Sequence, residues 1–333
     1  MTRAATRRTA AIALAAATML AGCSSNGDSD SASSASGAGF PVTIENTFGS
    51  TTIDSAPERI VTLGWNAQDV VYALGETPVG MPRYSYGAEE NGVMPWLQDQ
   101  FDPSKTTLLD AETSVPVEQV AELAPDVVLA PYEGFDQNTY DQLSAFSPTV
   151  AYPDKAWQTT WQDQTTIVGK ALGKSDEADQ LVAELEQTLS ETGAEHPEFA
   201  GKTISVVSLD PNTGTVSVYM PTDPRVQTLT ALGFENAPGV EQLTEDAGGK
   251  FFADISVENI ADVDADVVVA FVPNETTLSS NPAYANLGAL ERGTVVPLTD
   301  TQVVAGLSQT SVLATPWVLD KITPKLSDAA QKA

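Results

Sequence analysis

The sequence predicts an α/β protein made of two related lobes that a mostly helical segment joins. From Phe40 onward, short β-branched runs alternate with helical patterns, which is typical of βα units with parallel sheets. This alternation occurs twice, and a long helical pattern separates the two occurrences. The chain has 333 residues, of which 42% are hydrophobic and 18% charged, so each lobe is large enough to bury its own core.

The N-terminus carries the pattern of an export signal. Three arginines among the first eight residues precede an apolar run over residues 10–20, which predicts a signal peptide at residues 1–22. The tetrapeptide Leu-Ala-Gly-Cys that ends at Cys23 resembles the lipobox of bacterial lipoproteins, in which the cysteine is lipidated. Residues 23–39 are rich in Ser and Gly and predict a flexible tether. We therefore expect a globule outside the cytoplasm, held at the membrane by acyl chains on Cys23.

The two lobes share an internal repeat. Residues 117–130 align without gaps on residues 257–270, and seven of the fourteen positions are identical. Upstream of each copy stand an Ala-Leu-Gly triplet and, before it, an apolar strand pattern. Unrelated βα units can converge on similar apolar patterns, but the shared order favours two related lobes. The predicted boundaries are an N-terminal lobe at residues 40–155, a helical linker at 156–200 and a C-terminal lobe at 201–333.

The linker has a clear helical pattern. One helix is predicted from Trp161 to Leu172, ended by Gly173. Apolar residues then recur at helical spacing between residues 178 and 189, with Ser175 as the expected N-cap and Pro197 after the end. A helical connection of this kind predicts restrained lobe movement.

The loops that follow the strands predict a ligand site. In open parallel sheets, ligands bind beyond the carboxyl ends of the strands, where loops and helix N-termini converge. Asn66 is the expected cap of the helix that follows the first of these loops, with Asp69 at the capping-box position. The loops supply aromatic residues and one arginine in each lobe, which suits an oxygen-rich or anionic ligand or a metal chelate. The candidate ligand-binding residues are Trp65, Arg83, Tyr84, Tyr132, Tyr219, Arg225 and Phe252.

Charge and composition exclude several functions. Without the signal peptide, 13 Lys and Arg oppose 45 Asp and Glu, a net charge of −32 that repels phosphate backbones, so we expect no nucleic acid partner. His196 is the only histidine, so no histidine cluster could hold a transition metal, and we expect no metal site. The sequence has no nucleophile elbow, no phosphate loop and no histidine placed to activate a nucleophile, so we expect no enzyme.

Together these features resemble one family. The lipobox, the tether, the run from Pro57 to Leu63, the paired repeat and the helical linker are similar to the substrate-binding lipoproteins of ABC importers for ferric siderophores, which are related to cobalamin and haem binders. The resemblance implies two Rossmann-like lobes joined by a long helix, with the iron chelate in the cleft between them. It implies a monomer on the outer face of the cytoplasmic membrane, whose partners are a permease with its ATPase. Iron then enters only as part of the chelate, and no cofactor is expected.

The resemblance also implies roles for particular residues. Family members dock on the permease through one acidic residue per lobe, and these positions match Glu118 and Glu258. Acids near helix N-termini are also favoured by the helix dipole alone. Hydroxamate binders use an arginine in the second loop of the first lobe, comparable to Arg83. The few candidate cations favour a hydroxamate or mixed chelate over a catecholate. Citrate-like chelates, haem, cobalamin, and a surface protein or hydrolase without a transporter stay open as alternatives.

Overall fold

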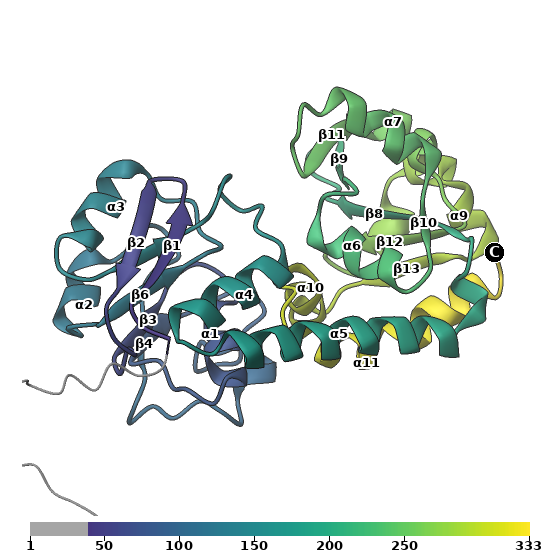
Figure 1. Cartoon of the computed structure of the whole chain (residues 1–333). Helices are drawn as coiled ribbons and strands as arrows, with labels where there is room; N and C mark the ends of the chain where they lie inside the picture. The colour runs from purple at the N-terminus through teal and green to yellow at the C-terminus, as the bar shows by residue number, and fades with distance from the viewer. Residues whose placement is uncertain (1–38) are drawn as a thin grey trace, which may run out of the picture. The chain divides into compact units, whose positions relative to one another are not determined.

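The computed structural model describes residues 39–333, apart from the side chains of Asp246 and Ser280. The predicted signal peptide, Cys23 and most of the predicted tether lie outside the described residues. The predicted α/β architecture of two lobes with a long helical connection is confirmed (Figure 1).

The N-terminal lobe contains a five-stranded parallel sheet in the order β5-β4-β3-β6-β7. Its central strands are short aliphatic runs whose side chains are buried on both faces, as expected for a parallel sheet covered by helices. The strands are β3 (Ile60–Thr62), β4 (Gly80–Pro82), β5 (Thr107–Leu109), β6 (Val127–Ala130) and β7 (Thr149–Ala151). The remaining elements of this lobe are the antiparallel pair β1 (Val42–Asn46) and β2 (Gly49–Ile53), and α1 (Ala67–Ala73), η1 (Pro95–Leu97), α2 (Val117–Glu122) and α3 (Gln137–Ser144).

The C-terminal lobe contains a mixed six-stranded sheet in the order β11-β9-β8-β12-β13, with β10 also paired to β8. The strands are β8 (Thr203–Leu209), β9 (Thr215–Tyr219), β10 (Glu235–Asn236), β11 (Phe252–Ser256), β12 (Val267–Phe271) and β13 (Val295–Leu298). The strands β8, β12 and β13 run parallel, whereas β9 and β11 form antiparallel pairs at one edge. The helices are α6 (Pro224–Ala231), α7 (Pro238–Asp246), η3 (Val257–Val263), α8 (Thr277–Ser280), η4 (Pro282–Asn286) and α9 (Gly288–Arg292).

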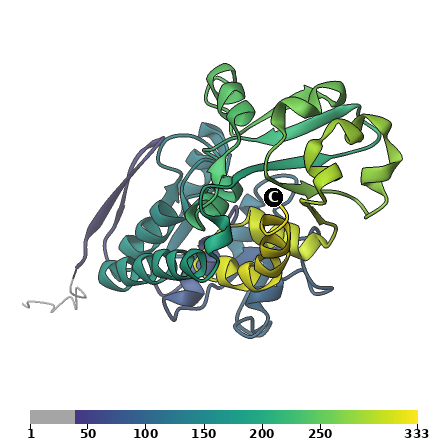
Figure 2. The same ribbon diagram turned by 90° about the vertical axis from the view of Figure 1, so that its right-hand side faces the viewer.

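Helices join the two lobes. The linker consists of α4 (Trp161–Ala171), α5 (Ser175–Glu195) and η2 (Pro197–Phe199). The chain then returns through α10 (Thr301–Ser308) and α11 (Ala314–Ala330), and both views show α11 in yellow beside α5 in teal (Figure 1, Figure 2). One buried apolar cluster includes Val127 of β6, Leu185 of α5, Val267 of β12 and Leu319 of α11, so the linker and the returning helix pack against both sheets.

The structure explains the internal repeat. The aspartate that precedes the buried strand of each copy accepts hydrogen bonds at the start of the neighbouring parallel strand, β3 in the first lobe and β8 in the second. Asp126 Oδ2 accepts from the backbone N–H of Arg59 at 2.9 Å, and Asp266 Oδ2 accepts from that of Thr203 at 2.8 Å. Each aspartate therefore ties two neighbouring parallel strands together. The helical parts of the repeat differ, since α2 is an α-helix and η3 is a 3-10 helix.

Helix ends follow the predicted turn chemistry in some places and not in others. Gly75, Gly173 and Gly233 follow the caps of α1, α4 and α6 with positive φ, which a residue without Cβ adopts at little cost. Ser175 is not an N-cap, because α5 begins at Ser175 itself and its cap position is held by Lys174, which makes no side-chain cap. The three glycines with positive φ therefore mark where helices end. Ser175, in contrast, does not mark the cap position of α5.

Candidate ligand-binding cleft

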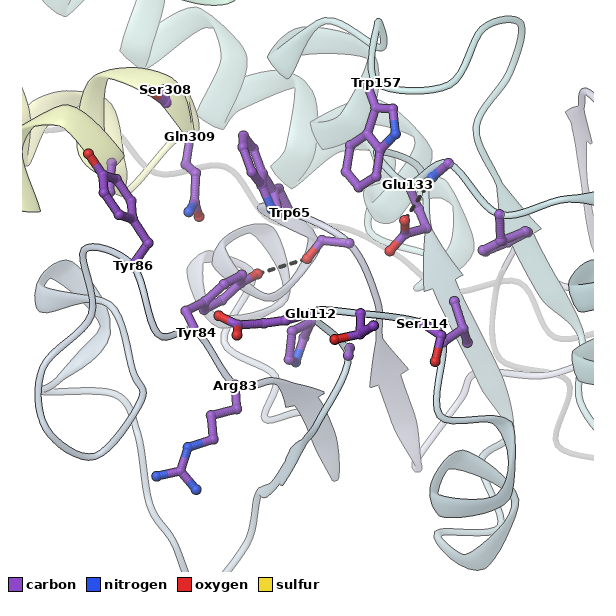
Figure 3. A pocket seen from close by; sticks show the side chains of 18 of the residues that line it. Trp65, Arg83, Tyr84, Tyr86, Glu112, Ser114, Glu133, Trp157, Ser308 and Gln309 are labelled. Carbon is purple, nitrogen blue, oxygen red and sulfur yellow. Dashed lines mark hydrogen bonds between the residues drawn. The ribbon is translucent and has the colours of Figure 1, made fainter. Parts of the chain in front are cut away.

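A cavity of about 910 Å³ lies between the two lobes (Figure 3). This volume is within the range that holds drug-sized ligands. The N-terminal lobe contributes the loops after β3, β4, β5 and β6, and the C-terminal lobe contributes the ends of β8, β9 and β12 together with α6 and α10. The cavity is thus bounded by the carboxyl ends of strands from both sheets, where the loops were predicted to converge.

The floor of the cavity in the N-terminal lobe is the point where the strand order reverses, between β3 and β6. The loops after these strands are tied together, because the backbone N–H of Trp65 donates to the carbonyl of Tyr132 at 3.0 Å. Gly64 makes this approach possible, since it has φ of 71° and a Cβ there would meet the Tyr132 carbonyl oxygen.

Two indole rings form part of the cavity lining, and the ring of Tyr132 packs behind them. Trp65 stacks near Tyr132 with ring centroids 6.1 Å apart, and Trp157 meets both rings edge-on at 5.9 and 5.7 Å. Trp65 and Trp157 line the cavity. Trp157 has φ of 61°, an uncommon conformation for a residue with a large side chain, and its indole lies against Gly134, where a Cβ would collide with it. The backbone of both loops therefore fixes the position of the Trp157 indole.

Arg225 lines the cavity from α6 of the C-terminal lobe, and its position is tightly held. Its Nε and Nη2 donate to the two carboxylate oxygens of the fully buried Asp223 at 2.7 and 2.8 Å, and its Nη1 donates to Ser308 Oγ at 3.3 Å. The guanidinium lies over the Tyr219 ring, 3.9 Å from its centroid. Since a guanidinium has five N–H donors, two remain for a ligand. These contacts raise the pKa of Arg225 against the opposing effect of burial, so the group stays charged.

Electrostatic interactions connect residues of the two lobes at the cavity. Burial raises the pKa of Tyr132 to about 12, and the nearby Asp223 carboxylate adds to this effect. Burial also raises the pKa of Tyr219. The charge of Arg225 acts to lower this pKa, and that of Asp223 acts to raise it. Both phenols therefore stay protonated at neutral pH, and the Arg225–Asp223 pair is close enough to influence tyrosines of both lobes.

Carboxylates also line the cavity. Glu133 follows β6, is half-buried, and accepts one hydrogen bond, from the adjacent backbone N–H of Gly134 at 2.8 Å. Burial raises the pKa of the Glu133 carboxyl. Glu112 is exposed at the edge of the cavity and accepts from the backbone N–H of Ser85, which lowers the pKa of the Glu112 carboxyl.

A buried carboxyl anchors the loop behind the cavity. Asp69 of α1 is fully buried, and its Oδ2 accepts from Trp96 Nε1 at 2.8 Å and from Ser311 Oγ at 2.5 Å. Asn66 does not cap α1 as predicted, since it has φ of 71° and its Nδ2 donates to the Thr310 carbonyl at 3.0 Å. Both residues therefore hold the α10–α11 loop, a contact between positions about 240 residues apart that no local pattern indicates.

The structure brings five of the seven predicted ligand residues to the cavity. Trp65, Arg83, Tyr84, Tyr219 and Arg225 line it. Their roles differ: Tyr84 is buried and donates its hydroxyl to the Gly64 carbonyl at 2.7 Å, and the exposed Arg83 guanidinium points away from the other labelled side chains (Figure 3).

Two predicted ligand residues do not line the cavity. Tyr132 lies behind Trp65 and Trp157 with only 6% of its surface exposed. Phe252 pairs with Tyr219 across β9 and β11 but does not reach the cavity lining. Both corrections have one cause, because closeness to a strand end does not decide which side of the loop a ring faces.

Several residues of the cavity were not among the predicted ligand residues, and Trp157, Glu133 and Gln309 are three of them. Trp157 fell in the predicted linker, Glu133 was one of many acids, and Gln309 follows α10 far along the chain. Of these three, only Trp157 carried a sequence signal for a ligand site, as a tryptophan between a strand and a helix. Gln309 is 96% buried, and its Oε1 makes no hydrogen bond among the described residues.

The two repeat-related glutamates occupy equivalent places. Glu118 lies in the first turn of α2 and Glu258 in the first turn of η3, each before a buried strand. Both side chains are exposed, and within residues 39–333 neither makes a hydrogen bond or ion pair. Their carboxylates lie in solvent, in the helical turns that follow β5 and β11.

Metal-binding clusters and membrane-spanning helices are both absent from residues 39–333. In the part of the chain that the structure describes, no group of three or more His, Cys, Asp or Glu is arranged to hold a metal ion. Nor does that part contain a helix whose length and apolar character would let it cross a membrane.

Known proteins resemble the chain over most of its length. Residues 60–301 match the family described as periplasmic binding protein. The probable siderophore-binding lipoprotein YfiY of Bacillus subtilis is 29% identical over 249 residues, 73% of each chain. The Fe(3+)-citrate-binding protein YfmC of the same organism is 24% identical over 294 residues, 85% of this chain and 86% of its own. The crystal structure of PiaA from Streptococcus pneumoniae in complex with ferrichrome has a TM-score of 0.79 and 30% identity, covering 87% of this chain and 99% of that one.

Proposed function

The chain belongs to the periplasmic binding protein family, and on that premise we propose that it captures a ferric siderophore outside the cytoplasm and delivers it to an ABC permease. The relatives named above are binding proteins, and YfiY is described as siderophore-binding. The proposed role is therefore binding and transfer without catalysis, with iron present only within the cargo.

The observation that carries this proposal is the cavity between the lobes. It is large enough for a bulky chelate, and it combines two indole surfaces with a fixed guanidinium from the C-terminal lobe. Indoles offer apolar area to the organic shell of a chelate, while the two free N–H donors of Arg225 suit the negatively charged oxygens around the metal.

We further propose a hydroxamate or mixed chelate as the cargo. PiaA, with which this chain shares 30% identity, was crystallised with ferrichrome, a ferric hydroxamate. The only cavity-lining cations among the described residues are Arg83 and Arg225. The positive charge of Arg225 is already paired with the Asp223 carboxylate. A chelate of charge about −3, such as a tris-catecholate, would lack counter-charges here.

Quenching of tryptophan fluorescence tests the cargo class, because Trp65 and Trp157 line the cavity. The purified protein is titrated with ferrichrome, ferrioxamine B, ferric enterobactin, ferric citrate, haem and cobalamin, and with the iron-free siderophores. We expect saturable quenching at submicromolar concentration by a ferric hydroxamate. Quenching by haem or cobalamin alone would show the same fold serving another ligand, and no quenching across the panel would contradict the proposal.

Docking on the permease is proposed to use Glu118 and Glu258. Both are exposed and unpaired among the described residues, and they sit at corresponding positions of the two lobes. The double variant Glu118→Arg, Glu258→Arg should abolish uptake of the ferric chelate in cells while the purified protein still binds it. Exposed ion pairs add little affinity each, so a single reversal should weaken uptake less than the double. Normal uptake by the double variant would contradict this docking role.

The proposed location is the outer face of the cytoplasmic membrane. It rests on the lipobox pattern at Cys23 and on the similarity to YfiY, which is described as a probable siderophore-binding lipoprotein. Replacing Cys23 with Ser should shift the protein from the membrane fraction to the soluble fraction or the medium. Retention of the variant in the membrane fraction would contradict lipid anchoring.

A further inference from the structure

We propose that Glu133, together with the Trp65 and Trp157 indoles, forms a subsite for a positively charged amine arm of the bound chelate. This inference rests on the proposed function and specifies the cargo further, as a neutral or cationic hydroxamate chelate that carries an ammonium group. The subsite belongs to the N-terminal side of the cavity, whereas Arg225 comes from α6 of the C-terminal lobe.

The first support is the isolation of the Glu133 carboxylate. Within residues 39–333, no Lys, Arg or His lies within ion-pair distance of Glu133, and its only hydrogen bond comes from the neighbouring backbone N–H of Gly134. A partly desolvated carboxylate without a counter-charge is unfavourable, so it is poorly explained as a structural residue. Burial raises its pKa, which agrees with the lack of a nearby cation. Because the carboxylate lines the cavity, a ligand can supply the missing charge.

The second support is the aromatic surroundings. Glu133 lies next to Trp157 in Figure 3, and the Trp157 indole rests on Gly134, the residue that follows it. Trp65 meets Trp157 at 5.9 Å between ring centroids. Indole faces attract ammonium groups more strongly than other aromatic rings do, and a carboxylate beside them adds a direct ion pair.

The third support is the charge balance of the whole cavity lining. The charged residues of the lining are three carboxylates and two arginines: Glu112, Glu133, Asp136, Arg83 and Arg225. Arg225 is already paired with a buried aspartate, and the Arg83 guanidinium points away. Gln309 adds an amide oxygen without a partner among the described residues. The lining is therefore richer in acceptors than in free cations, which suits a ligand that brings positive charge and N–H donors.

A matched pair of ligands tests the subsite directly. Ferrioxamine B is a linear ferric trihydroxamate that ends in a primary ammonium, and its N-acetyl derivative keeps the same metal centre without the charge. Dissociation constants are measured by fluorescence quenching and by calorimetry for the wild type, for Glu133→Gln and for Glu122→Gln. Glu122 is an exposed carboxylate at the end of α2, outside the cavity lining, and so serves as the control position.

We expect the wild type to bind ferrioxamine B about tenfold more tightly than the acetylated chelate, and Glu133→Gln to reduce this ratio to about one. Glu122→Gln should keep the wild-type ratio. Equal affinity of the wild type for the two chelates, or an unchanged ratio in Glu133→Gln with a wild-type unfolding midpoint, would overturn the subsite while leaving siderophore binding intact. Failure of both chelates to bind, with binding of haem or cobalamin instead, would overturn the proposed function itself.

Discussion

Replacing Asp69 with Asn should change how the stability of this protein depends on pH. The Asp69 side chain is fully buried between α1, η1 and the α10–α11 loop, and it accepts hydrogen bonds from Trp96, Ser311 and Gln68. Asparagine has the same shape, and its oxygen can keep the bonds from Trp96 and Ser311. The NH2 group of the asparagine would face the side chain of Gln68. The Oε1 of Gln68 lacks a partner among the described residues, and it could accept a hydrogen bond from this NH2 group once the Gln68 amide flips. The variant should therefore fold.

The magnitude follows from the pKa of Asp69. Burial raises this pKa from 3.8 to about 7, and the hydrogen bonds from Ser311, Trp96 and Gln68 only partly oppose the effect. Between pH values of about 4 and 7, the native state keeps a proton that the unfolded state has released, so the free energy of unfolding falls as pH rises. The slope is about 1.4 kcal/mol per pH unit, which over about 3 units amounts to about 4 kcal/mol. Above about pH 7 this contribution levels off.

Urea unfolding of the wild type and Asp69→Asn between about pH 5 and 8 measures this contribution. Asparagine does not titrate, so the stability of the variant relative to the wild type should increase by about 3 kcal/mol between pH values of about 5 and 7 and then level off. Other titrating groups are common to both proteins and cancel in the difference. A difference in the free energy of unfolding that stays constant from pH 5 to 8 would refute the reasoning, because it would mean that Asp69 is ionised in both states.

Two further predictions concern the cavity and the repeat. Arg225→Lys keeps the charge but cannot bond both oxygens of Asp223, so we expect the affinity for the ferric chelate to fall about tenfold or more and the thermal unfolding midpoint to drop. Titration calorimetry and thermal unfolding measure these two quantities, and unchanged values would contradict the role given to the bidentate pair. Asp266→Ala removes the acceptor for Thr203 at the start of β8 and should lower the free energy of unfolding, measured by urea unfolding, by about 2 kcal/mol. The control Asp262→Ala, at an exposed position nearby, should change it little, and equal losses in both variants would show that the bond contributes nothing specific.

Local patterns were sufficient for the general architecture. Alternating strand and helix signals predicted the α/β class, and the repeat at residues 117–130 and 257–270 correctly indicated equivalent parts of two lobes. The predicted linker helices agree closely with α4 and α5, because helical periodicity and terminal glycines act over a few residues. Prediction was weaker in the loops, where Tyr132 and Phe252 were placed in the cleft although neither lines the cavity.

By itself, the sequence determined the α/β class, the acidic character, the order of the elements and the approximate ends of its helices, since these depend on composition and near neighbours. Only the tertiary structure decided that Asp69 meets Ser311, that Arg225 is already paired, and that Glu133 lies in the cavity without a cation. Such properties depend on which distant side chains packing brings together and on how much water it removes from them. Spacing along the chain carries no information about either.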